Sequence, residues 1–128
     1  MDKIKARFRQ YQEAIEASNI VSKTDINGTI TFVNDEFCKM SGFTREELIG
    51  ANHNIVRHPE VPKDVYARLW DTILAKKVHK GTIRNRTKDG RDVYLNTTII
   101  PILNLSGQIE EFLAIRYDVT DVINLNNE

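Results

Sequence analysis

The sequence predicts an α+β domain: a five-stranded antiparallel sheet with helices on one face and an amphipathic helix at the N-terminus. Two short β-prone runs near the start are joined by Asn27-Gly28, which is a strong hairpin signal. Three longer β-prone runs close the chain, separated by turn-forming residues. Helical patterns lie between these two groups of strands, and strands that are grouped rather than alternating with helices are typical of an α+β fold.

The composition favours one cytoplasmic domain. A chain of 128 residues is long enough for a single core. The 18 basic and 18 acidic residues balance, so no charge footprint for nucleic acid or an anionic membrane is present. The longest apolar run, TIIPIL, is too short to span a bilayer, and MDKIKARFRQ lacks a signal-peptide core. The single cysteine, Cys38, excludes an internal disulfide and fits a reducing compartment.

The N-terminal segment, residues 1–18, is predicted to be a helix from Asp2 to about Ala17. Its apolar residues are spaced by four, three and four positions, which forms a single stripe: Ile4, Phe8, Tyr11 and Ile15. Two heptads do not establish a coiled coil, so the stripe has two interpretations. We expect it to form a homodimer, through this helix or the sheet; packing on its own domain is the alternative.

The next elements are defined by turn and capping residues. The first hairpin pairs Asn19–Asp25 with Thr29–Val33. Asn34-Asp35 then caps a short helix that ends at Gly42 and carries Cys38 as a small buried residue. The segment from Thr44 to Glu47 has the spacing of a capping box, which predicts a second short helix ending at Gly50.

The stretch from Gly50 to Pro62, GANHNIVRHPEVP, is unusually rich in polar side chains, with two His, two Asn, one Arg and one Glu. Pro59 favours an extended backbone at His58, and Pro62 suits the start of a helix, so the segment is predicted to be a stiff connector. Arg57 and His58 upstream of a helix N-terminus would attract a phosphate or carboxylate. The alternative is a rigid turn whose polar groups satisfy one another.

The second half predicts one long helix and three strands. Val65, Leu69 and Ile73 recur every four residues, with Tyr66 and Trp70 beside them, which indicates an amphipathic helix over residues 62–77. Trp70 is expected in the core. The strands are predicted at 78–87, 92–102 and 108–119, and alternation along the middle strand gives it two different faces.

Three motifs resemble those of PAS domains: NGTITFVNDEFCKMSGFTREELIG, the NRTKDG turn and the closing YDVTD. The resemblance covers residues 19–121. The central HNIVRHPEVP is similar to the sensory module of bacterial aerotaxis receptors and related sensors, several of which hold FAD. It implies a sensory module of a bacterial signal-transduction protein. Such a module binds a small ligand or FAD between the sheet and the helices and relays redox, oxygen or ligand state to an output domain.

The resemblance also implies site residues in this chain. The candidates for cofactor binding are Asn34, His53, Arg57, His58, Glu60, His79, Asn85 and Arg116. His79 stands where FAD-binding relatives commonly carry Trp. Arg116 shares a strand face with Phe112 and Ala114 and needs a buried partner, either a ligand anion or Glu60.

Signal output is assigned by the same resemblance to Asp118 and Thr120, with residues 122–128 as the start of a linker to an output domain. We expect no catalysis by this chain, because no nucleophile elbow, P-loop, dinucleotide fingerprint or HExxH helix is present. Histidine kinase or diguanylate cyclase activity would belong to the output domain. The alternative function is a ligand-free PAS module for dimerisation or protein interaction.

Other cofactors are disfavoured. A light-oxygen-voltage photosensor would need a cysteine where this sequence has His53. Haem sensors of the oxygen-sensor kinase kind use a histidine on the long helix, which has none here, although His53 or His58 stays open as an axial ligand. A zinc site from His53, His58 and His79 would lack thiolates and a compact motif, so no metal is expected.

Overall fold

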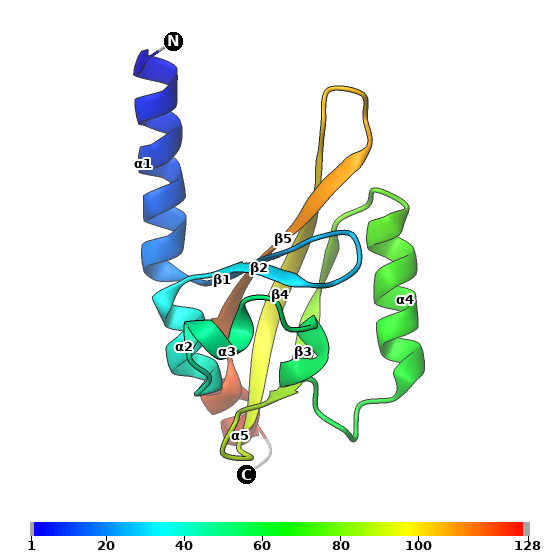
Figure 1. The fold of residues 1–128 in the computed structure, drawn as a ribbon. Helices are drawn as coiled ribbons and strands as arrows, with labels where there is room; N and C mark the ends of the chain where they lie inside the picture. Colours follow the sequence, from blue (N-terminus) through cyan, green and yellow to red (C-terminus); the bar gives the residue numbers. More distant parts are fainter. Residues whose placement is uncertain (1, 127–128) are drawn as a thin grey trace.

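The structure, a computed structural model, describes residues 2–126 and contains one five-stranded sheet (Figure 1). This confirms the predicted α+β class and the antiparallel sheet. In chain order the elements are α1 (Asp2–Ser18), β1 (Ile20–Thr24), β2 (Ile30–Val33), α2 (Asp35–Ser41), α3 (Arg45–Leu48), the 3-10 turn η1 (His53–Val56), α4 (Lys63–Leu74), β3 (His79–Arg86), β4 (Asp92–Leu103), β5 (Ile109–Asp118) and α5 (Thr120–Asn126).

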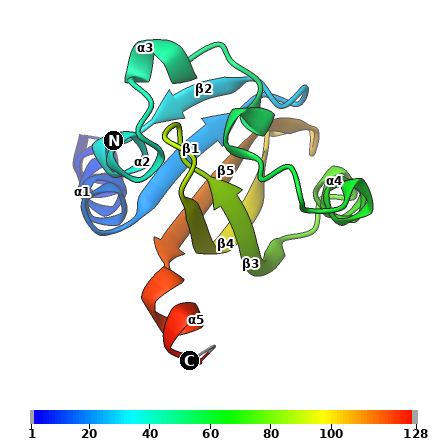
Figure 2. The ribbon, with the colours of Figure 1, turned by 90° about the horizontal axis from the view of Figure 1, so that it is seen from below.

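The sheet order is β2-β1-β5-β4-β3, so the last strand lies at the centre between the two hairpins. β1 pairs with β5 from Ile20 opposite Arg116 to Thr24 opposite Phe112. Side chains alternate between the two faces of a strand, and Phe112, Ala114 and Arg116 share the face covered by α4, as predicted. α2, α3, η1 and α4 cover this face, while α1 projects from the side of the sheet (Figures 1 and 2).

The predicted caps are confirmed at both short helices. The Asn34 side chain accepts a hydrogen bond from the Phe37 amide at the start of α2, and Gly42 ends this helix with a φ of +78°. Thr44 and Glu47 form the reciprocal bonds of a capping box at α3. These contacts join residues only three positions apart, so the local sequence is sufficient to specify them.

Two connecting segments differ from the expectation. The stretch predicted as a stiff connector contains the turn η1, because the Asn52 side chain accepts a hydrogen bond from the Asn54 amide and closes a tight turn. The chain after β5 forms α5 through Asn126. Met1 of the predicted segment 1–18 and residues 127–128 of the predicted linker lie outside the described residues. No helix within residues 2–126 has the length and apolar character needed to cross a bilayer.

The core is divided into two clusters. One gathers around the first hairpin and the short helices, with Phe37, Leu48 and Leu95 almost fully buried. The other joins α4 to β5 through Leu69, Ile73 and Phe112, and Trp70 packs against it. The space between these two clusters is where the candidate site lies.

Candidate functional site

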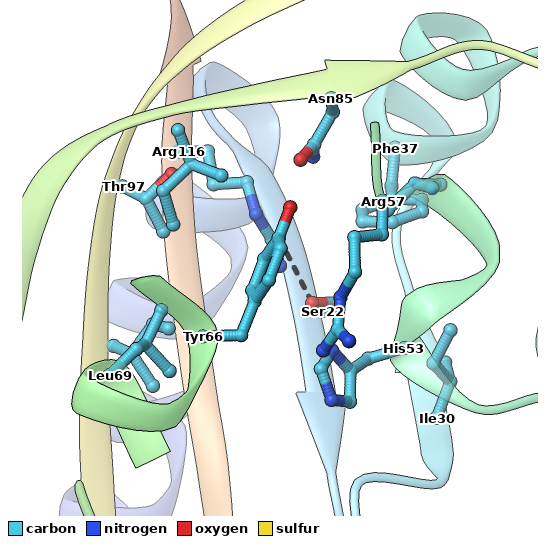
Figure 3. A pocket seen from close by; sticks show the side chains of 13 residues that line it. Ser22, Ile30, Phe37, His53, Arg57, Tyr66, Leu69, Asn85, Thr97 and Arg116 are labelled. Carbon is cyan, nitrogen blue, oxygen red and sulfur yellow. Dashed lines mark hydrogen bonds between the residues drawn. The ribbon is translucent and has the colours of Figure 1, made fainter. Parts of the chain in front are cut away.

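A cavity of about 70 Å³ lies between the concave face of the sheet and the helices (Figure 3). A second cavity of about 50 Å³ adjoins it toward Trp70 and Phe112 and shares Arg116 and His53 with it. Both clusters of the core contribute apolar walls to the first cavity, for example Phe37 from one and Leu69 from the other. Its polar lining residues are Ser22, His53, Arg57, Tyr66, Asn85, Thr97 and Arg116.

The segment around η1 crosses the sheet face and closes one side of the cavity. At one end the His53 amide donates to the Gly28 carbonyl oxygen, with an N···O distance of 2.9 Å. At the other end Arg57 forms an antiparallel bridge with Asn85 of β3. The backbone therefore fixes His53 and Arg57 over the cavity from both edges of the sheet.

Arg57 and Tyr66 lie against each other in the lining of the cavity (Figure 3). The Arg57 guanidinium carbon lies 3.7 Å from the centre of the Tyr66 ring, a close cation–π contact. Arg57 Nε and the Tyr66 hydroxyl are both buried and have no hydrogen-bond partner among residues 2–126. Burial raises the pKa of the Tyr66 hydroxyl, while the Arg57 charge opposes this rise. The pair therefore presents two unused donors inside the protein.

Arg116 enters the same cavity from the central strand β5. Its Nη1 donates to Ser22 Oγ at 3.0 Å, and its guanidinium carbon lies 5.2 Å from the centre of the Phe37 ring. None of the described residues lining the cavity carries a carboxylate. Burial lowers the pKa of Arg116 to about 10. The guanidinium is still protonated at neutral pH, so the cavity contains positive charge without an acidic partner.

His53 lies between this charged region and the second core cluster. Its ring centre is 5.3 Å from that of Trp70, with the planes tilted. Burial, followed by the charges of Arg57 and Arg116, lowers the pKa of His53 to about 4. The imidazole is therefore neutral at pH 7 and has one nitrogen that can accept a hydrogen bond.

The other four candidate residues lie away from the cavity. Asn34 caps α2, and its amide nitrogen also donates to the carbonyl oxygens of Glu16 and Asn19. His79 is half-buried at the start of β3, and burial lowers its pKa.

His58 and Glu60 belong to a polar cluster on the rim of the sheet. His58 is buried, its Nε2 lies 2.9 Å from Asp92 Oδ1, and its Nδ1 accepts from the Glu60 amide. The Glu60 carboxylate is exposed and accepts from Arg84 at 3.0 Å rather than from Arg116. Arg57 and His58 are neighbours in sequence but point to different sites.

Three lining residues, Tyr66, Ser22 and Thr97, were not among the residues predicted for the site. Tyr66 lies on the same helix face as Leu69 and Ile73, so the helical spacing predicts that it faces the interior of the domain. Ser22 and Thr97 lie among apolar residues on the inward faces of their strands, and both are buried. The sequence feature that could have identified them is a hydroxyl residue at an inward-facing strand position among apolar residues. A buried hydroxyl needs a hydrogen-bond partner, which a ligand can supply.

The residues assigned to signal output form a junction at the end of β5. Thr120 Oγ1 donates to Asp118 Oδ1, and it accepts from the Tyr94 amide of β4 at 2.9 Å. The Asp118 carboxylate also accepts from the Thr120 amide at 2.8 Å. The Val119 amide donates to the Tyr94 carbonyl oxygen at 2.8 Å. The start of α5 is thereby attached to the sheet.

The fold and this buried cavity define the class of protein. The PAS fold family matches residues 6–119, which is most of the chain, and the chain belongs to this family. This confirms the resemblance found in the sequence. PAS domains are sensory modules rather than catalytic ones, so the chain is a sensory domain of signal transduction.

Two bacterial proteins with related sequences support this family assignment. The chain is 36% identical over 104 residues to the aerotaxis receptor of Escherichia coli K12, covering 81% of the chain and 20% of that receptor. It is 30% identical over 105 residues to the nitrogen fixation regulatory protein of Klebsiella pneumoniae, covering 82% of the chain and 21% of that protein. The chain thus spans about a fifth of the length of these curated relatives.

A solved PAS domain from Colwellia psychrerythraea superposes with a TM-score of 0.80. The match covers 89% of this chain and 98% of the solved chain, at 23% sequence identity. Agreement at this level of identity establishes the shared fold.

Proposed function

We propose that this chain is the ligand-sensing part of a larger signalling protein, and that its cavity binds a small molecule rich in acceptor oxygens. The observation that carries the proposal is the pair of buried, unpartnered donors, Arg57 Nε and the Tyr66 hydroxyl. A buried donor without an acceptor costs roughly 1–3 kcal/mol. Two such donors facing one cavity are explained by a ligand that supplies the acceptors.

The charge in the cavity supports the same class of ligand. Arg57 and Arg116 bring two guanidinium groups, whereas no described lining residue brings a carboxylate. A carboxylate, a phosphate or a ring with carbonyl oxygens would offset this charge through charge-assisted hydrogen bonds. Asn85 adds an amide that both donates and accepts, so it complements a carbonyl next to an N–H group.

FAD fits the donor set of this cavity. The carbonyl oxygens of a flavin ring are acceptors suited to Arg57, Tyr66 and Arg116, and the imide edge of the ring suits Asn85. Bound flavin would supply reversible redox chemistry to the sensor. Pockets for ligands of cofactor size typically enclose about 300–1,000 Å³, well above the 70 Å³ found here. Binding of the ring therefore requires the cavity to widen, by movement of lining side chains such as Arg57 and Tyr66.

A route from the cavity to an output domain follows β5. Arg116 lies two positions before Asp118, and Asp118 binds Thr120 at the start of α5. A ligand that accepts a hydrogen bond from the Arg116 guanidinium would shift this side chain, and the shift would be passed along β5 to Asp118 and Thr120 at its end. We propose that the relay proceeds through Asp118 and Thr120 into the residues beyond 121.

The direct test is a visible absorption spectrum of the freshly purified protein, together with mass spectrometry of the ligand released by denaturation. A flavin spectrum would support FAD and a redox role. A colourless carboxylate or phosphate ester would support the ligand class and reject FAD. A protein that releases nothing, and whose melting temperature is unchanged by FAD, would contradict the proposal.

The Arg116→Met variant makes the test specific. It keeps much of the side-chain volume and removes the charge, so we expect retention of the ligand to fall at least ten-fold. Arg86→Met is the matched control, because Arg86 is exposed at the end of the edge strand β3 and lies outside the cavity. Equal retention by both variants would show that the cavity charge does not hold the ligand.

The second candidate function is a dimerisation module, and one observation favours it. The stripe of α1 predicted to mediate a homodimer is exposed, with Ile4 at 71% and Phe8 at 68% exposure. The two functions are compatible, because a dimer would bring two sensors and their output domains together.

A further inference from the structure

The candidate cavity has to widen before a ligand can enter it. Its volume is about 70 Å³, whereas pockets for cofactor-sized ligands enclose roughly 300–1,000 Å³. The walls differ in how firmly they are held. The central strands of the sheet are paired on both sides, and α4 packs on β5 through the buried residues Leu69, Ile73 and Phe112. Close-packed walls of this kind resist displacement.

The segment that follows η1 is held in a different way. Residues 57–62, here called the strap, connect η1 to α4 beside the edge strand β3 (Figure 2). No side chain of the strap belongs to either apolar core cluster of the described residues. The strap is fastened to the sheet by the backbone bridge between Arg57 and Asn85 and by polar side chains. It can therefore move away from the sheet without exposing the apolar core.

Four polar side chains, here called the latch, form a chain of hydrogen bonds from the strap to the sheet and back. His58 Nδ1 accepts from the Glu60 amide, so Nε2 carries the ring proton. His58 Nε2 then donates to Asp92 Oδ1 at 2.9 Å. The other carboxylate oxygen of Asp92 accepts from Arg84 Nε at 3.1 Å. Arg84 Nη1 completes the chain by donating to Glu60 Oε2 at 3.0 Å.

The latch combines one buried contact with exposed ones. The His58 side chain is 4% exposed, whereas that of Glu60 is 70% exposed. Hydrogen bonds from Arg84 and from His58 lower the pKa of the Asp92 carboxyl, so it is charged at neutral pH. Ion pairs that water reaches are individually weak. The buried imidazole, by contrast, loses a required partner when the strap leaves the sheet. Asp92 is therefore the residue on which the closed position depends most.

We propose that the strap is the gate of the cavity, and that Asp92 and Arg84 are positioning residues that hold it closed. Arg57 connects the gate to the site, because its backbone belongs to the strap while its guanidinium lies over Tyr66 in the cavity lining. A ligand that accepts a hydrogen bond from Arg57 favours the closed strap. The inference rests on the proposed function of the cavity as a ligand site, and it assigns control of ligand exchange to residues outside that cavity.

Labelling of a cysteine placed in the cavity tests the gate without any ligand. Ser22→Cys in a Cys38→Ser background puts a thiol at a buried lining position. Its rate of reaction with iodoacetamide measures access from solvent. Asp92→Ala removes the partner of the buried His58, so we expect this rate to rise roughly ten-fold. Asp71→Ala, at an exposed position on α4, should leave the rate unchanged.

A second buried position separates opening of the gate from general loosening of the domain. Ser41 on α2 is fully buried and does not line the cavity. Labelling of Ser41→Cys in the same background therefore needs a wider unfolding event, and Asp92→Ala should change its rate little. Equal acceleration at Ser22→Cys and Ser41→Cys would overturn the gate, and so would the absence of acceleration at Ser22→Cys.

A crosslink provides the reverse experiment, with FAD as the probe. Glu60→Cys/Arg84→Cys in the Cys38→Ser background breaks the latch, and a short bismaleimide between the two new thiols replaces it with a covalent link. We expect FAD release, followed by flavin fluorescence, to be faster than in the natural sequence before crosslinking and clearly slower after it. Unchanged release after crosslinking would overturn the gate. A chain that binds no FAD would reject FAD as the ligand, while the cysteine labelling would still decide the gate.

Discussion

The Arg57 guanidinium lies over the Tyr66 ring inside the protein, with its central carbon 3.7 Å from the ring centre. Arg57 Nε and the Tyr66 hydroxyl are buried, yet neither has a hydrogen-bond partner within the described residues. They come from different elements, the end of η1 and the helix α4. A ligand that accepts hydrogen bonds from both donors would therefore contact both elements. Its binding would be detectable as a movement of η1 relative to α4.

Removal of the Tyr66 hydroxyl should stabilise the ligand-free protein. Tyr66→Phe deletes a buried donor that has no acceptor, and we expect the free energy of unfolding to rise by about 1 kcal/mol. Urea unfolding after removal of any bound ligand would measure this. Tyr117→Phe, at an exposed position on β5, should leave the stability unchanged. If Tyr66→Phe is less stable than the natural sequence, the hydroxyl has a partner and the cavity does not need a ligand to supply one.

The stability of the domain should fall on mild acidification because of His53. Its pKa is lowered to about 4, by burial first and then by Arg57 and Arg116, whereas an unfolded histidine titrates near 6.5. Between these two values the unfolded chain binds more protons than the folded one, so stability is complete above about pH 6.5 and declines toward pH 4. The loss is at most about 3 kcal/mol, and less because the ring is partly exposed.

Urea unfolding at several pH values between 7.5 and 4.5 would follow this decline. The His53→Gln variant should show a clearly flatter profile over that range. The pKa of His79 is also lowered by burial, so part of the slope should remain. An unchanged slope in His53→Gln would show that His53 titrates normally in the folded protein.

Gly28 should be more sensitive to substitution than other turn glycines. Its φ is +84°, and a Cβ there would lie 2.7 Å from His53 Cδ2 and 3.1 Å from a Trp70 ring carbon. Gly107 has a similar φ of +80° but open space around the same position. Both alanine variants pay about 1–2 kcal/mol for the left-handed backbone. We expect Gly28→Ala to lose a further 1–3 kcal/mol, roughly, from overpacking.

Thermal or urea unfolding of the two alanine variants isolates the contact with His53, since the backbone cost is common to both. Equal destabilisation would mean that the His53 ring moves aside without cost. In that case the His53 side chain, which forms the wall of the cavity next to the first hairpin, can be displaced without loss of stability.

The junction at Thr120 should control how firmly α5 is attached to the sheet. Thr120→Val removes the acceptor of the Tyr94 amide and the donor to Asp118. We expect a loss of about 1–2 kcal/mol in the free energy of unfolding. Hydrogen exchange at the Tyr94 amide should accelerate as well. Thr82→Val, at an exposed position on β3, is the control. Unchanged exchange at Tyr94 in Thr120→Val would argue against this junction as the output route.

The fold class, most element boundaries and the caps could be predicted from the sequence, because they depend on patterns and contacts among residues close together in the chain. Asn34 and Thr44 cap their helices through residues three positions away, and strand alternation places Arg116 with its inward-facing neighbours. The PAS motifs indicated the family, and the match of the PAS fold family to residues 6–119 confirms it.

Which polar residues contact one another could be seen only in the folded structure. Arg116 reaches Ser22 across 94 positions of the chain, and His58 pairs with Asp92 across 34 positions. Nothing local to His58 indicates that it bonds at the rim while its neighbour Arg57 enters the cavity. Such partners are selected by strand pairing and packing, since a buried polar group has to find an acceptor or donor wherever the fold brings one within reach.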